Sequence, residues 1–175
     1  MAATIRAERA GDEPAIGAVV TAAFESVGHG DLVAAIRASP NFVPELSLVA
    51  EADDVIVGHV MISHVLLDHA STQRRVASLS PLAVAPEHQR RGIGSMLVRA
   101  VTARADELGE PLVVLEGDPG YYSRFGFEPA VPFGIHITLP SWAPPEAAQV
   151  LRLRGYDPSI RGDVVYPPAF DLVVE

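Results

Sequence analysis

The stretch Leu82-Ala83-Val84-Ala85-Pro86-Glu87-His88-Gln89-Arg90-Arg91-Gly92-Ile93-Gly94 runs from an apolar strand through a glycine turn into a helix. The helix is predicted by apolar residues at three- and four-residue steps: Ile93, Met96, Leu97, Ala100, Val101, Ala105 and Leu108. The first amides of a helix have no partner within it and lie at the positive end of its dipole. Because Gly92 and Gly94 carry no side chains and Arg90 and Arg91 add positive charge, this turn is a candidate phosphate site.

Two common nucleotide-binding motifs are excluded. The dinucleotide fingerprint needs a glycine or alanine three residues after Gly94, where Leu97 stands, and a P-loop needs a lysine, which the sequence lacks. A glycine pair before a helix is also compatible with a plain strand-to-helix turn, so its meaning depends on the rest of the chain.

Strands and helices are mixed along the sequence, which predicts an α/β or α+β fold around one mixed sheet. The expected elements are strands over 4–8, 46–50, 55–67, 76–84, 112–115, 135–139 and 149–153, and helices from Glu13, over 31–38, from Ile93 and over 119–125. Asp12 is expected to cap the first helix, and the strands 46–50 and 55–67 to form a hairpin. Pro81 cannot donate a hydrogen bond within its strand, so a bulge is expected there.

Composition restricts the class of protein. With 175 residues, 49% of them hydrophobic and 20% charged, the chain 1–175 is expected to form a single globular domain. A net charge of -9 argues against nucleic acid as a partner, and no apolar run is long enough to span a membrane. No signal peptide is visible, so a cytoplasmic location is expected. The lack of cysteine excludes disulfides and thiolate metal sites.

The segment 82–94 resembles the acetyl-CoA-binding motif of the GNAT N-acetyltransferase superfamily, which reads Gln/Arg-x-x-Gly-x-Gly/Ala at a helix start. A second segment, 121–127, resembles the Tyr-x-x-x-Gly-Phe sequence after the fifth strand of that family. Together with the late stretch 162–170, these segments are most similar to the YhbS-like branch of predicted N-acetyltransferases. The resemblance implies a mixed, mostly antiparallel sheet of about six to seven strands flanked by helices and splayed near Pro81.

The resemblance also implies roles for individual positions. The amides from Arg90 to Ser95 would bind the pyrophosphate of acetyl-CoA, the strand 82–84 would pair with its pantetheine arm, and the amide of Leu82 would polarise the thioester carbonyl. Tyr122 aligns with the general acid of the family, a role that a phenol suits because it is protonated at neutral pH; the alternative is an aromatic side chain that packs under the sheet. Tyr121 is expected to be structural. The implied acetyl-CoA-binding residues are Leu82, Ala83, Val84, Gln89, Arg90, Arg91, Gly92, Ile93, Gly94 and Ser95.

The general base stays open at this point. Some relatives have a glutamate where this chain has Ser78, and the candidates here are Glu51, His64, Glu116 and Asp118, or a water relay. No metal site is expected: His59 and His64 fall on opposite faces of a strand, and neither they nor His69 is joined by cysteine or a cluster of carboxylates. Trp142 is expected to pack a C-terminal segment over the core, the alternative being that it lines the mouth of the acceptor site.

The predicted activity is transfer of an acetyl group from acetyl-CoA to the amine of a small molecule or peptide. Two alternatives remain: a non-catalytic acyl-CoA-binding or sensing domain, and an acyltransferase that uses a different acyl-CoA. A homodimer is suggested by the resemblance, since sheet-edge dimers are frequent in the superfamily.

Overall fold

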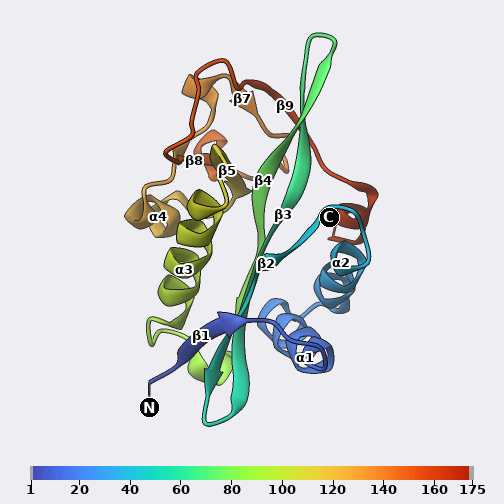
Figure 1. The fold of residues 1–175 in the computed structure, drawn as a ribbon, viewed down its shortest axis with the longest axis vertical. Coiled ribbons are helices and arrows are strands. Elements are labelled where there is room, and N and C mark those ends of the chain that lie inside the picture. The colour runs from blue at the N-terminus through green and yellow to red at the C-terminus, as the bar shows by residue number, and fades with distance from the viewer. Residues whose placement is uncertain (1, 174–175) are drawn as a thin grey trace.

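The fold is a twisted mixed sheet with helices on both faces, seen in a computed structural model that describes residues 2–173 (Figure 1). The strands are β1 (Thr4–Ala7), β2 (Phe42–Ala52), β3 (Val55–His69), β4 (Thr72–Val84), β5 (Leu112–Glu116), β6 (Glu128–Pro129), β7 (Ile135–His136), β8 (Ala148–Arg152) and β9 (Gly162–Val165). The helices are α1 (Glu13–Phe24), α2 (Val27–Arg37), α3 (Ile93–Glu107) and α4 (Pro119–Tyr122), with 3-10 turns at Pro86–His88, Ser123–Phe125, Val131–Phe133, Pro145–Ala147 and Pro168–Val173.

The strand order is β1-β2-β3-β4-β5-β8-β6, and β9 pairs with both β3 and β7. Helix α3 covers one face, where its Leu97 and Val101 pack with Leu48 and Val60 of the sheet. Helices α1 and α2 cover the other face, over residues such as Met61. The two faces are clearly separated in Figure 1, with α3 and α4 on one side of the long β3–β4 hairpin and α1 and α2 on the other.

The sheet opens between β4 and β5. These two strands are parallel, and they pair only at Ala77 with Val113 and at Ser78 with Val114. Beyond that point β4 stays with β3, but its register shifts: Val60 faces Leu82 whereas Ile62 faces Leu79. Two β4 residues, Ser80 and Pro81, therefore lie opposite one β3 residue. This confirms the expected bulge at Pro81 and the splay beside it, because a strand that bends at a bulge moves away from its neighbour.

Several predicted boundaries were wrong. Helix α2 begins at Val27 and not at residue 31, because Gly28 and Gly30 obscure the helical pattern of its first turn. The polar stretch 68–73 is mostly strand, with only a tight turn between β3 and β4, since charged residues are tolerated in the exposed end of a hairpin. Asp12 stands at the N-cap of α1 but its side chain does not cap the helix; it bonds Arg6 instead.

The C-terminal third also differs from the prediction. The described residues form nine strands and not about six to seven, since β9 pairs antiparallel with β3 and parallel with β7. The strand expected over 135–139 is two residues long. Trp142 was expected in the core, but 73% of its surface is exposed, and it lies between Pro140 and Pro144 in a loop that belongs to no strand.

Candidate functional site

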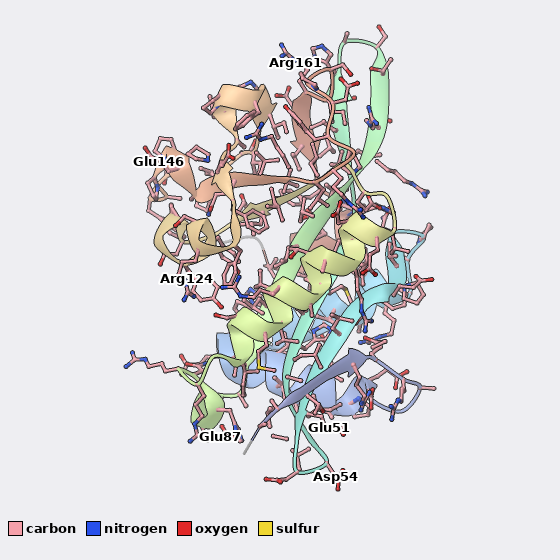
Figure 2. The ribbon with its side chains drawn as sticks, turned by 60° about the vertical axis from the view of Figure 1, so that its left-hand side comes forward. Glu51, Asp54, Glu87, Arg124, Glu146 and Arg161 are labelled. Atoms are coloured by element: carbon pink, nitrogen blue, oxygen red, sulfur yellow. The ribbon has the colours of Figure 1, made fainter. Side chains whose placement is uncertain are left out.

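A groove of about 500 Å³ lies at the N-terminus of α3, between the end of β4 and the segment α4. Its lining residues come from two stretches of the sequence, the run from the end of β4 into α3 and the region of α4: Leu82, Val84, His88, Gln89, Arg90, Gly92, Ile93, Gly94, Ser95, Tyr121 and Arg124. Figure 2 shows Arg124 and Glu87 on either side of the α3 N-terminal end. The groove therefore extends from the glycine turn onto Leu82 and Val84, which belong to the part of β4 that has separated from β5.

The backbone of the turn directs amides into this groove. Arg90 and Gly92 have left-handed backbone angles, with φ of 61° and 81°, and no side chain caps the N-terminus of α3. The amide side chain of Gln89 bonds the carbonyl oxygen of Val84 at 3.0 Å and so ties the turn to the strand. A left-handed arginine costs conformational energy. The result is a set of uncapped helix amides facing a groove, which is an anion-binding arrangement.

Tyr121 and Arg124 form the far wall. An added Cβ at Gly94 would lie 2.6 Å from the Tyr121 hydroxyl, so this tyrosine touches the turn directly. The Nε of Arg124 donates to the carbonyl oxygen of Tyr121 at 3.1 Å, and its guanidinium lies 4.7 Å from the centre of the Tyr121 ring. Tyr121 was expected to be structural. Arg124 and His88 also line the groove but were not among the residues predicted to bind acetyl-CoA. The i, i+3 spacing of Tyr121 and Arg124 on one helical turn could have indicated their shared side.

Cations are left unpaired at this groove although the chain is acidic. Within residues 2–173, Arg6, Arg37, Arg152 and Arg154 take part in ion pairs. None of the ion pairs in that part of the chain includes Arg90 or Arg124, both of which line the groove. Both side chains are exposed, so a polyanionic ligand would meet them without competition from a carboxylate.

Tyr122 lies on the same face of the sheet as α3. Its ring rests on Gly117, where an added Cβ would lie 2.6 Å from Cε2, and it meets Phe127 edge-on with ring centres 5.7 Å apart. Burial, helped by the neighbouring Tyr121, raises the pKa of the Tyr122 phenol well above its ordinary value of 10.0. Tyr122 is therefore protonated at neutral pH and can act as a proton donor.

A family model described as an acetyltransferase (GNAT) domain matches residues 4–130. The chain belongs to the GNAT family of acetyltransferases. It is thus an acyltransferase with the fold and glycine turn that its sequence predicts.

The relatives of this acetyltransferase include uncharacterized proteins of Escherichia coli strain K12. The N-acetyltransferase YhbS is 35% identical over 150 residues, which cover 85% of this chain and 86% of YhbS. The N-acetyltransferase YjhQ is 34% identical over 118 residues, which cover 67% of this chain and 65% of YjhQ. The similarity to YhbS confirms the expected branch of the family.

Two solved structures are similar over nearly the whole chain. Escherichia coli YhbS in complex with CoA has a TM-score of 0.85 at 32% identity, covering 97% of this chain and 92% of that one. A GNAT acetyltransferase of Brucella melitensis in complex with acetyl-CoA has a TM-score of 0.78 at 34% identity, covering 97% and 99%. No helix among the described residues of this acetyltransferase is long and apolar enough to cross a membrane.

The groove brings together most of the residues predicted to bind acetyl-CoA. Leu82, Val84, Gln89, Arg90, Gly92, Ile93, Gly94 and Ser95 line it, whereas Ala83 and Arg91 do not. Ala83 is buried on the opposite face with the α1–α2 cluster, because side chains alternate along a strand, and only its main chain remains for pairing. Arg91 is exposed outside the groove. Arg74 and Arg75 are exposed near the tip of the β3–β4 hairpin.

The candidate bases occupy very different surroundings. Glu51 is bound at 2.7 Å by Arg6, and Asp118 accepts from the amide of Gly120 at 2.9 Å as the cap of α4. His64 meets Glu110 at 2.6 Å. Glu116 is an exposed residue at the end of β5. Partial burial of its carboxyl group raises the pKa of that group.

The other histidines do not form a metal centre. Among residues 2–173, no group of three or more histidine, cysteine or carboxylate side chains is close enough to hold a metal ion. His59 is fully buried on the α1–α2 face, where its Nε2 lies 3.0 Å from the hydroxyl of Ser47. Ser47 in turn donates to Glu8, which is paired with Arg37. This polar network belongs to the core.

Proposed function

We propose that this acetyltransferase transfers the acetyl group of acetyl-CoA to a primary amine of a small molecule or peptide, by direct attack of the amine on the thioester. Residues 1–175 would act as one domain. The observation that carries the proposal is the groove at the start of α3, which joins uncapped helix amides to the separated end of β4. The relatives crystallised with CoA and acetyl-CoA support this choice of donor.

The groove suits the donor from end to end. Pyrophosphate oxygens would accept hydrogen bonds from the amides of Arg90 to Ser95, with the Arg90 and Arg124 side chains supplying counter-charge. The pantetheine arm would lie along Leu82, Ala83 and Val84 and use the main-chain groups that β5 no longer satisfies. The bulge at Ser80 and Pro81 therefore has a role, since it opens the sheet where the arm must enter.

The chemistry needs a polarised carbonyl and a proton for the departing sulfur. The amide of Leu82, just after the bulge, is the proposed donor to the thioester oxygen, which becomes an oxyanion when the amine attacks. The hydroxyl of Tyr122 would give its proton to the CoA thiolate as the carbon–sulfur bond breaks. Its raised pKa means that the phenol carries its proton at neutral pH.

The test compares Tyr122→Phe with wild type on a panel of primary amines. Released CoA is measured with a thiol reagent, and the chain itself adds no background because it contains no cysteine. Turnover should fall by at least ~10-fold while acetyl-CoA affinity barely changes. Tyr156→Phe is the matched control, since Tyr156 packs against Phe133 far along the chain.

Three outcomes are informative. A loss of turnover confined to Tyr122→Phe supports the general acid. Wild-type turnover in that variant contradicts the role of Tyr122 but leaves the transferase intact. Tight acetyl-CoA binding without turnover on any amine would instead indicate an acyl-CoA-sensing domain.

A further inference from the structure

A second groove follows α3 beyond the groove at its start, which is called the donor groove from here on. The second groove has a volume of about 280 Å³ and lies between α3, the turn Ser123–Phe125 and the region of β8. Its lining residues are Arg99, Thr102, Ala103, Asp106, Phe125, Leu151 and Leu153. Arg99 follows Ser95 of the donor groove by four residues, and residues four apart share one face of a helix. The two grooves therefore lie next to each other along one side of α3.

Phe125 connects the two grooves. The guanidinium carbon of Arg99 lies 5.0 Å from the centre of the Phe125 ring, and that of Arg124 lies 5.1 Å from the same centre. Arg99 lines the second groove and Arg124 lines the donor groove, where Figure 2 shows it beside the N-terminal half of α3. Contact with the ring restricts where these long side chains can lie but leaves N–H groups of each guanidinium free to donate. One aromatic ring thus holds two cations close together at the junction of the grooves.

Neither of these guanidinium groups has a carboxylate partner. None of the ion pairs among residues 2–173 includes Arg99 or Arg124, and both side chains are exposed. Asp106 is the acidic residue in the lining of the second groove, and its carboxylate is bound by Arg154 at 2.9 Å. On a chain with a net charge of -9, two adjacent unpaired cations make this junction a local attraction for an anionic group.

Acetyl-CoA carries anionic groups at two places. Its pyrophosphate joins the pantetheine arm to a nucleoside, and the ribose of that nucleoside carries a further phosphate on its 3′ oxygen. With the pyrophosphate at the amides of Arg90 to Ser95 and the arm along 82–84, the nucleoside would leave the turn on the side away from β4. Arg124 borders that side, and Arg99 follows one helical turn beyond Ser95. A helical turn rises about 5.4 Å, a distance that a ribose can span between its 5′ and 3′ phosphates.

We propose that the 3′-phosphate of acetyl-CoA binds between the guanidinium groups of Arg99 and Arg124, and that Arg99 distinguishes donors that carry this phosphate from donors that lack it. The proposal rests on the proposed function. Arg124 also faces the pyrophosphate in the donor groove, whereas Arg99 belongs to the second groove and would contact the 3′-phosphate alone. The planar N–H donors of arginine suit phosphate oxygens.

This site would restrict the acyl donor by its nucleotide end. Thioesters of free CoA carry the 3′-phosphate, whereas acyl groups attached to a protein through phosphopantetheine carry neither the nucleoside nor this phosphate. Arg99 would therefore favour free CoA thioesters over carrier-bound acyl groups, although the arm and the thioester are the same in both.

Arg99 has a second conceivable role, because a long arginine side chain can cover an aromatic ring without binding any ligand. The two roles differ in what a substitution changes. Loss of a packing contact alters the free energy of unfolding and acts alike on every donor. Loss of a phosphate contact weakens only those donors that carry the 3′-phosphate, so the preference between two ligands separates the roles.

The experiment measures the dissociation constants of CoA and 3′-dephospho-CoA by calorimetry for wild type, Arg99→Gln and Arg124→Ala. Wild type should bind CoA about 10-fold more tightly than dephospho-CoA, the effect of one hydrogen-bonded charge pair. Arg99→Gln should lose most of this preference and bind dephospho-CoA as wild type does. Arg124→Ala should weaken both ligands, since Arg124 also lines the donor groove. Arg104→Gln is the matched control, an arginine of the last turn of α3 outside the lining of either groove.

The results separate this proposal from the proposed function, because binding is measured without an acceptor. Equal affinities of wild type for CoA and dephospho-CoA overturn the phosphate site, and so does a preference that Arg99→Gln retains or that Arg104→Gln loses equally. An Arg99→Gln variant that weakens both ligands alike makes Arg99 a packing residue and overturns its role in selection. In each of these cases acetyl transfer to an amine can still be observed. A wild type that binds neither CoA nor acetyl-CoA overturns the proposed function as well.

Discussion

The hydroxyl of Tyr121 occupies the space that a side chain at Gly94 would need: an added Cβ would lie 2.6 Å from the oxygen but 3.8 Å from the ring carbon that bears it. The second glycine of the turn is therefore required by a neighbour on α4 and not only by the ligand. This contact connects the wall of the groove to the amides at its floor.

Gly94→Ala should raise the KM for acetyl-CoA by ~10-fold or more, because the methyl group displaces Tyr121 from the groove. Tyr121→Phe removes the colliding oxygen and leaves an ordinary contact, so the double variant should regain most of the lost affinity. Steady-state kinetics and acetyl-CoA titration of the wild type, the two single variants and the double variant give the coupling energy between positions 94 and 121. Additive effects of the two substitutions would show that the collision is not what requires glycine.

Arg124→Ala should weaken acetyl-CoA binding by ~10-fold and reduce its dependence on salt, because a cation without a carboxylate partner is removed from the groove. Arg161→Ala is the control, since Figure 2 shows Arg161 at the opposite end of the molecule from the start of α3. Binding is measured by calorimetry from low to high ionic strength. Equal losses in the two variants would mean that only the net charge matters.

Gly28→Ala and Gly17→Ala should change stability in opposite directions. A methyl group on Gly28 meets the carbonyl oxygen of Leu172, whereas one on Gly17 meets no atom within 4 Å. Gly17→Ala should stabilise by up to ~1 kcal/mol through helix propensity, and Gly28→Ala should destabilise by ~1–3 kcal/mol through overpacking. Urea unfolding measures both. Hydrogen exchange in 166–173 should accelerate only in Gly28→Ala, and unchanged protection there would contradict the contact.

Acidification should destabilise the protein through His59. Burial, with the nearby charge of Arg37, lowers the His59 pKa from 6.5 to about 3. The unfolded chain then binds the proton more readily, so the stabilising effect is complete above pH 6.5 and is lost as the pH falls toward 3. The loss at pH 5 is ~2 kcal/mol.

The pH dependence of unfolding in urea tests this assignment in three proteins. His59→Leu should remove that part of the slope between pH 7 and 5, and Ser47 keeps its bond to Glu8 in this variant. His136→Leu, at an exposed position, should keep the slope. The same slope in His59→Leu as in wild type would assign the pH dependence to other groups.

The donor side could be predicted from sequence because its determinants are local. The glycine turn and the apolar period of α3 lie within one stretch of sequence. Pro81 predicts a bulge because it has no backbone N–H to donate within its strand. Arg124 and the groove-facing side of Tyr121 were not predicted, since their approach to Gly94 depends on how α4 packs beside α3.

The acceptor side could not be predicted in the same way. Glu116 was one of four candidate bases with nothing in the sequence to rank them, because each is a single polar residue next to a turn or strand. β9 was missed because its four residues pair with β3 and β7, neither of which is adjacent in sequence.

The segment 166–173 lies outside the stretch 4–130 that the GNAT family model matches, yet it packs on the face of the sheet opposite α3. The groove at the start of α3 and this part of the cover on the opposite sheet face therefore belong to separate, consecutive parts of one polypeptide. Such a division is modular: exchanging the C-terminal part between relatives should transplant acceptor preference while the acetyl-CoA machinery stays intact. Divergence of substrate range among these enzymes would then require changes in only the final few dozen residues.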